Sequence, residues 1–316
     1  MEIFNKTTNI NFLGWRLYAA ILSTVLILIG IASFAKNGLN LGIDFTGGTL
    51  LEVNYQQPAD LESIRAALTD DGYEKATVQN FGSAQDVMVR LPLGEDTSTV
   101  KLSQEVMQTL TANQPDVEQR RVEFVGPQFG RELAEKGSLA LLYALGIVMI
   151  YVAFRFEWKF GVGSVVALVH DVLITVGAFA VMQIEFSLPV LAAVLAVIGY
   201  SLNDTIVVFD RIRENFRKMR ETDTVKIMNA SVNQTLPRTI LTSITTLLVL
   251  FALFLFGGEV LRGFSIALII GVLVGTYSSI FVASPVVLAL GVSKDDLIAE
   301  VVEKEGADQP DHDLLP

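Results

Sequence analysis

The chain has 316 residues, of which 51% are hydrophobic and 18% are charged. With a mean hydropathy of +0.49, this composition excludes an ordinary soluble domain, because such domains contain about 25% charged residues. The net charge of −11 gives no indication of a nucleic-acid partner, and the absence of cysteine excludes disulfides and thiol chemistry. The sequence indicates no cofactor and no metal site.

Six apolar stretches are long enough to cross a membrane. Five contain no charged residue and no histidine, namely residues 17–35, 137–154, 186–202, 239–258 and 263–293. The sixth, residues 161–184, is interrupted only by His170 and Asp171. Because about 20 apolar residues span the hydrocarbon core as a helix, we predict six transmembrane helices, with helices two to six in residues 137–292. Asp204 lies on helix four if that helix continues to residue 209.

Residues 36–136, between the first two predicted membrane helices, have frequent charges and short apolar runs. The pattern predicts strands at residues 50–55, 76–81, 86–91 and 118–125, and helices at residues 59–68 and 102–112. The order β-α-β-β-α-β is typical of a ferredoxin-like split βαβ fold. We therefore expect a polytopic α-helical membrane protein that carries one α+β domain.

The basic residues predict how the chain is oriented. Lys6 and Arg16 precede helix one, and Arg155 and Lys159 follow helix two. Further basic residues fill a segment at residues 211–236. By the positive-inside rule, residues 1–16 and the acidic tail at 293–316 face the cytosol, and domain 36–136 lies on the far side. The stretch 211–220 is expected to lie on anionic membrane lipid. Cleavage of helix one as a signal peptide is the less favoured alternative.

Asp204 is the first candidate for a functional residue. An ionised aspartate near the bilayer centre costs roughly 2.5 to 3.5 kcal/mol, so it requires a use or a partner. Arg238, which we predict to open helix five after Pro237, is the candidate partner. A proton relay is expected from this pair, with a static buried ion pair as the alternative. Nearby polar side chains are candidate supporting residues: Tyr200, Ser201, Asn203, Thr242 and Thr246.

His170 and Asp171 are a second polar point in the predicted membrane helices. Adjacent residues on a helix project about 100° apart, so the pair is not expected to face one site together. Membership of the relay and a hydrogen-bonded structural pair both remain open.

Three glycine-containing segments have structural interpretations. Residues 41–50, "LGIDFTGGTL", lack the Gly-Lys-Ser/Thr ending of a phosphate loop and predict a tight entry into the soluble domain. Residues 126–130, "GPQFG", are predicted to be its exit linker. Gly271 and Gly275 have the G-x-x-x-G spacing that favours close helix packing.

Six motifs occur along the chain in this order: "GIDFTGG", "VGPQFG", "ALVHDVLIT", "VIGYSLNDTIVVFDRIRENFR", "TLPRTILTSITT" and "LFGGEVLRGFS". With these motifs the chain resembles the SecD/SecF family, membrane subunits of the bacterial Sec protein-export machinery within the resistance-nodulation-division superfamily. The resemblance implies a six-helix half-unit in the inner membrane, with a periplasmic loop that holds unfolded preprotein. It also implies SecD as sister subunit, the SecYEG channel and YajC as further partners, and Asp204 and Arg238 as proton-pathway residues that use the proton gradient to promote late steps of export.

Two other functions share some of these features. A proton-coupled exporter of small molecules or lipids would have the same architecture, although such pumps usually hold both halves in one chain. An intramembrane aspartyl protease would need two facing acids, for which Asp171 and Asp204 are the candidates by count. The G-x-G-D pattern of such proteases is missing, and "GYSLND" stands in its place.

Overall fold

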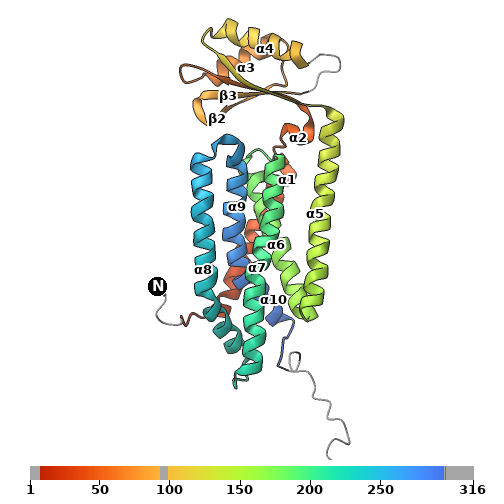
Figure 1. The fold of residues 1–316 in the computed structure, drawn as a ribbon, viewed down its shortest axis with the longest axis vertical. Helices are drawn as coiled ribbons and strands as arrows, with labels where there is room; N and C mark the ends of the chain where they lie inside the picture. The colour runs from red at the N-terminus through yellow and green to blue at the C-terminus, as the bar shows by residue number, and fades with distance from the viewer. Residues whose placement is uncertain (1–7, 93–98, 295, 297–316) are drawn as a thin grey trace, which may run out of the picture.

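The computed structural model describes residues 8–92, 99–294 and 296. Figure 1 shows an elongated molecule in which a small sheet domain lies at one end of a bundle of long helices. Within the described residues, six helices are long and apolar enough to cross a membrane. The predicted polytopic architecture is therefore confirmed.

The long helices are nearly continuous from one end of the bundle to the other. Their bounds are α1 (Arg16–Asn37), α5 (Pro127–Arg155), α6 (Trp158–Met182), α7 (Leu188–Lys218), α8 (Thr224–Phe256) and α9 (Gly258–Ser278). A short turn, η1 (Leu13–Trp15), precedes α1. After α9, a π-helical turn (Ser279–Ala283) and the short helix α10 (Ser284–Ala289) continue the last span.

Two segments predicted to lie outside the membrane helices are continuous with those helices. The exit linker predicted at 126–130 forms the start of α5, where Pro127 occupies the first turn and has no N–H to leave unpaired. The basic segment predicted at 211–236 is divided between α7, which continues to Lys218, and α8, which begins at Thr224. The Asp223 carboxylate accepts from two backbone N–H groups at the start of α8, so this cap sets where the helix begins.

Pro237 lies inside α8, so the prediction that Arg238 opens this helix is wrong. A proline in a helix leaves the carbonyl four residues earlier without its N–H donor. Here that carbonyl belongs to Asn233, and the Thr8 hydroxyl donates to it at 3.5 Å. The Asn233 side chain in turn binds the backbone N–H and carbonyl of Ile10, at 2.9 and 2.8 Å. The N-terminal segment thus covers the helix where proline interrupts its hydrogen bonding.

The sheet domain has the predicted ferredoxin-like fold. Its strands are β1 (Gly48–Asn54), β2 (Thr77–Phe81), β3 (Ser83–Leu91) and β4 (Glu118–Val125), and its helices are α3 (Leu61–Asp70) and α4 (Thr99–Asn113). The strand order is β2-β3-β1-β4. All three pairings are antiparallel, so β1 and β2 run parallel with β3 between them, as a split βαβ unit requires.

The two faces of the sheet are covered differently. On one face, side chains from α3 and α4 pack with the inward residues of the strands into a core that includes Leu51, Ile64, Val87, Val89 and Leu110. The alternate residues Leu50 and Met88 join a separate small cluster with Ile43 from the segment that leaves α1. Because side chains alternate along a strand, the second face is left for contact with the helical bundle.

The chain enters the domain through a tight turn. After α1, a short helix, α2 (Ile43–Thr46), ends at two glycines with positive φ, Gly47 at 71° and Gly48 at 137°. A Cβ on Gly48 would lie 2.7 Å from the Leu91 carbonyl oxygen, so a side chain has no space there. This geometry confirms the predicted glycine-dependent entry.

The glycine pair of α9 permits close packing against α7. A Cβ on Gly271 would lie 2.0 Å from Val197 Cγ2, and a Cβ on Gly275 would lie 3.0 Å from Ser201 Cβ. The predicted role of the G-x-x-x-G spacing is confirmed. The close approach at Gly275 also brings α9 next to a buried hydroxyl of α7.

Candidate functional site in the helical bundle

Asp204 lies on α7 inside the bundle, and its side chain is almost completely buried, at 2% exposed. Its Oδ2 atom has no hydrogen-bond partner among the described residues. A buried carboxylate without a donor is unfavourable unless it binds a proton, a cation or a further protein group. Asp204 Oδ2 therefore lacks the partner that a static structural role would give it among the described residues, and Asp204 remains the candidate functional acid.

Arg238 is on the neighbouring helix, α8, and its side chain is exposed on the surface of the chain. Asp204 and Arg238 interact electrostatically. Among the ion pairs between described residues, none joins these two side chains. In this packing the acid and the guanidinium influence each other at a distance and are not locked together.

The polar residues predicted to support Asp204 have other partners. The Tyr200 hydroxyl donates to Ser243 Oγ at 3.3 Å, and Ser243 contacts Thr276 at 2.7 Å, so this set joins α7, α8 and α9. The Thr242 and Thr246 hydroxyls donate to carbonyls of their own helix at 2.9 and 2.8 Å. Asn203 is exposed.

His170 and Asp171 share one hydrogen-bonded cluster, contrary to the expectation that they face different ways. His170 Nδ1 lies 2.8 Å from Asp171 Oδ1. Asp171 Oδ2 accepts from the hydroxyls of Ser201 and, at 2.7 Å, Ser278. Ser201 therefore serves Asp171 in this packing. Sequence reasoning missed Ser278, whose only signal is a hydroxyl within an apolar stretch.

These contacts do not support the protease alternative. An aspartyl protease needs two carboxylates that share a water and a proton. The Asp171 carboxylate is already bound by His170, Ser201 and Ser278, whereas the Asp204 Oδ2 has no partner among the described residues. The two acids have different surroundings and therefore different chemistry.

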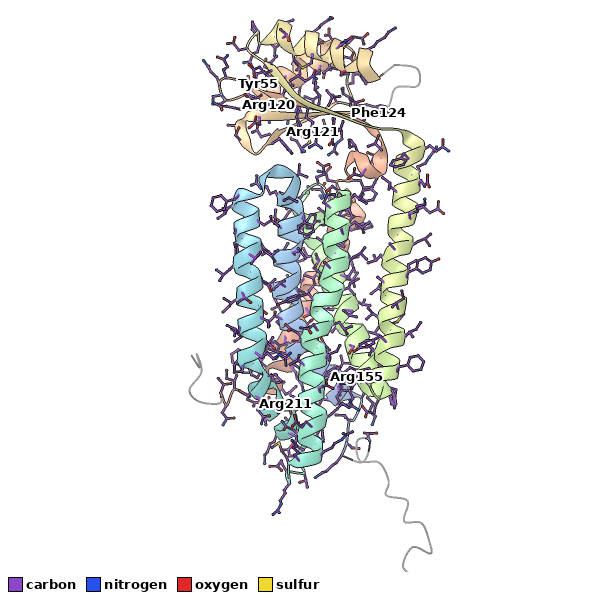
Figure 2. The ribbon with its side chains drawn as sticks, viewed as in Figure 1. Tyr55, Arg120, Arg121, Phe124, Arg155 and Arg211 are labelled. Atoms are coloured by element: carbon purple, nitrogen blue, oxygen red, sulfur yellow. The ribbon has the colours of Figure 1, made fainter. Side chains whose placement is uncertain are left out.

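A cavity of about 530 Å³ separates the free face of the sheet from the ends of the helices. Glu52 and Arg121 line it from the sheet. Glu185 lines it from the turn between α6 and α7, and Arg262 lines it from the beginning of α9. Figure 2 shows Arg121 on the side of the sheet that faces the bundle. The sheet domain is thus held over the helix ends with space beneath it.

Six membrane-spanning helices and a split-βαβ domain after the first of them define a polytopic membrane protein that carries one α+β domain. The family model described as "Protein export membrane protein SecD/SecF, C-terminal" matches residues 105–293, and that of the SecD/SecF GG motif matches residues 32–59. The chain belongs to the SecF family of protein translocase subunits.

Relatives in that family match over nearly their whole length. The protein translocase subunit SecF of Vibrio alginolyticus is 51% identical over 97% of this chain and 98% of its own. The SecF subunit of Pseudomonas aeruginosa is 50% identical over 96% of this chain and 99% of its own.

Two solved structures share the fold. The crystal structure of SecDF, a translocon-associated membrane protein from Thermus, is 38% identical and has a TM-score of 0.83 over 91% of this chain. A structure of SecDF in a super-membrane-facing form has a TM-score of 0.68 over the same share. This chain spans 39% of the length of either SecDF chain.

Proposed function

We propose that this translocase subunit works with SecD as a proton-driven pair that promotes late steps of protein export across the bacterial inner membrane. The observation that carries the proposal is the buried Asp204, whose Oδ2 has no hydrogen-bond partner among the described residues, close to an exposed Arg238 on the next helix. An acid in this position can gain and lose a proton as its distance from the cation changes.

SecD is the proposed sister subunit. The SecDF structures carry both names in one chain, of which this chain matches 39%, so a second half is expected beside it. The exposed Arg238 suits such an interface, because a cation on the outside of one half can complete a site with acids of the other. SecYEG and YajC are the further proposed partners, and these two rest on the family resemblance.

The proposed orientation places both termini in the cytosol and the sheet domain in the periplasm. Figure 2 shows Arg155 and Arg211 at the end of the bundle opposite the sheet domain, so the basic residues and the domain lie at different membrane surfaces. The positive-inside rule assigns the basic end to the cytosol.

Unfolded preprotein is the proposed client of the periplasmic domain. With the strand order β2-β3-β1-β4, β2 and β4 are the edges of the sheet, each with one side free to pair with an extended chain. A domain that holds a segment after it emerges prevents it from sliding back. The two SecDF forms differ in their similarity to this chain, with TM-scores of 0.83 and 0.68, which supports movement of the parts.

Export of a reporter precursor into inverted membrane vesicles tests the proposal. Asp204→Asn and Arg238→Met are expected to abolish the acceleration of late export by a proton gradient while complex assembly stays intact. Ser138→Ala is the control, because the hydroxyl of this exposed serine of α5 donates to the Ala134 carbonyl of its own helix. A gradient effect that is equal in wild type and Asp204→Asn would show that the acid is structural. Loss of assembly in the variants would instead support the static-pair alternative.

A further inference from the structure

A polar cluster lies where α1, α6, α7 and α9 meet, and the proposed relay does not use it. Its centre is the pair His170 and Asp171 of α6, which are 5% and 0% exposed. The helices around the pair contribute hydroxyl groups from Ser23 of α1, Ser201 of α7, and Tyr277 and Ser278 of α9. The number of hydrogens these groups can supply determines the protonation of the pair.

On the carboxylate side, both oxygens of Asp171 are engaged. Oδ2 accepts from the hydroxyls of Ser201 and Ser278, and each serine supplies its own hydrogen. Oδ1 lies 2.8 Å from His170 Nδ1, and this contact needs one further hydrogen. Either the imidazole or the carboxyl group can carry that hydrogen.

On the imidazole side, three contacts follow one another. His170 Nε2 lies 2.9 Å from Ser23 Oγ, and Ser23 Oγ lies 3.1 Å from the Tyr277 hydroxyl. The Tyr277 hydroxyl donates to the Ala19 carbonyl at 2.9 Å. Serine and tyrosine supply one hydrogen each. Either hydroxyl of the Ser23–Tyr277 contact can be the donor. When Tyr277 gives its hydrogen to the Ala19 carbonyl, Ser23 gives its own to Tyr277, and the contact between Ser23 and Nε2 then needs a hydrogen on the ring.

We propose that His170 and Asp171 form a second proton-binding site of the bundle, which in this packing holds one proton more than a neutral imidazole and a carboxylate. Nε2 donates to Ser23, and a second hydrogen lies between Nδ1 and Oδ1. The pair then has no net charge, which suits its apolar surroundings.

Loss of this proton changes how α1 is held. Nε2 becomes an acceptor, Ser23 turns its hydrogen toward the ring, and Tyr277 loses the hydrogen bond from Ser23. The pair also acquires a negative charge inside the bundle. Among the described residues, the Tyr277 hydroxyl of α9 reaches the pair through Ser23 of α1. On α7, Tyr200 and Asp204 are the titratable residues within one turn of Ser201, which contacts Asp171.

The connection of this site to export rests on the proposed function. The segment after α1 leads directly into the sheet domain, whereas α7 carries Asp204. The cluster joins these two helices through α6, so its proton occupancy couples the acid-bearing helix to the helix that holds the domain. The protonation itself does not depend on the proposed function and is testable on the chain alone.

His170 can be observed by itself in nuclear magnetic resonance. The chain has two histidines, and the other, His312, lies outside the described residues. The chain is labelled with ¹⁵N-histidine in a His312→Gln background and studied in lipid nanodiscs at neutral pH. We expect His170 Nε2 to resonate as a protonated ring nitrogen coupled to its hydrogen. An Nε2 that resonates as an unprotonated acceptor would overturn the proposal.

Two variants with small changes of volume complete the test. Ser23→Ala removes the acceptor of the Nε2 hydrogen and is expected to shift the Nε2 resonance, whereas Ser138→Ala shifts nothing. An unchanged resonance in Ser23→Ala contradicts the proposed contact.

In the vesicle assay, Asp171→Asn is expected to lose the acceleration of export by the proton gradient while complex assembly stays intact. Acceleration that survives in Asp171→Asn overturns the proposed coupling. If Asp204→Asn keeps full acceleration, the proposed function fails, whatever the state of His170.

Discussion

Arg90 of β3 lies 2.7 Å from Glu185 in the turn between α6 and α7, so this ion pair joins the sheet domain to the helical bundle. The pair is largely shielded, with side chains 14% and 24% exposed. Arg90 also donates to the Leu41 carbonyl at 3.0 Å, in the segment that leaves α1. A single guanidinium therefore ties together the domain, its entry segment and the end of the bundle.

Removing Arg90 should be more harmful than neutralising Glu185. Arg90→Met leaves a shielded carboxylate without its cation, and we expect it to weaken docking of the domain by about 1–2 kcal/mol, since a fully buried pair would cost more. Glu185→Gln removes the charge that burial disfavours and should dock as well as wild type. Hydrogen exchange of the 38–47 segment measures docking. Equal losses of docking in Arg90→Met and Glu185→Gln would show that the attraction between the two charges outweighs the cost of burying the Glu185 carboxylate.

Docking should also weaken as pH rises. Burial raises the pKa of Glu185 above its ordinary value of 4.5, Arg90 lowers it in part, and Asp44 and Glu123 raise it further. The docked state therefore binds more protons than a released domain, so this contribution is fully present below about pH 4.5 and is lost as pH rises through the raised pKa. Glu185→Gln should flatten the dependence in the same exchange measurement. A dependence that persists in this variant would point to Glu52, whose pKa burial also raises.

A methyl group on Gly271 should disturb the centre of the bundle. Its Cβ would lie 2.0 Å from Cγ2 of the rigid, branched Val197, so the helices must separate. We expect Gly271→Ala to destabilise the chain by about 1–3 kcal/mol, seen as a lower Tm in nanodiscs. Gly146→Ala and Gly199→Ala are matched controls in other membrane helices, because their Cβ atoms would meet nothing within 4 Å. An unchanged Tm for Gly271→Ala would contradict the packing.

The stability of the sheet domain should depend on the face covered by α3 and α4. Leu51 is completely buried there, and Leu51→Ala is expected to cost about 2–5 kcal/mol through lost contact and a cavity. Phe124→Ala, at a residue 50% exposed on the edge strand β4, should change stability by no more than about 0.5 kcal/mol. Limited proteolysis in the full chain measures both. Similar losses of stability in Leu51→Ala and Phe124→Ala would mean that the Phe124 side chain is covered by a surface that this structure does not contain.

The sequence by itself determined the number of spans and the order of elements in the domain, and it identified Asp204 as an acid within an apolar run. Each depends on a local property: an apolar run as long as the bilayer is thick, the period of a strand or helix, and a charge inside such a run. The entry turn was also predictable, because a glycine pair with positive φ is a property of a few adjacent residues.

The tertiary structure decided which polar groups meet. Pro237 lies within a helix, and the Asn233 carbonyl that it leaves free accepts from the hydroxyl of Thr8, which is far away in the sequence. Asp171 is satisfied by serines from two other helices, whereas Asp204, on the same helix as one of those serines, has an oxygen without a partner among the described residues. Hydroxyls in apolar stretches have no periodic signal, and a hydrogen bond forms only where packing brings donor and acceptor within about 3 Å.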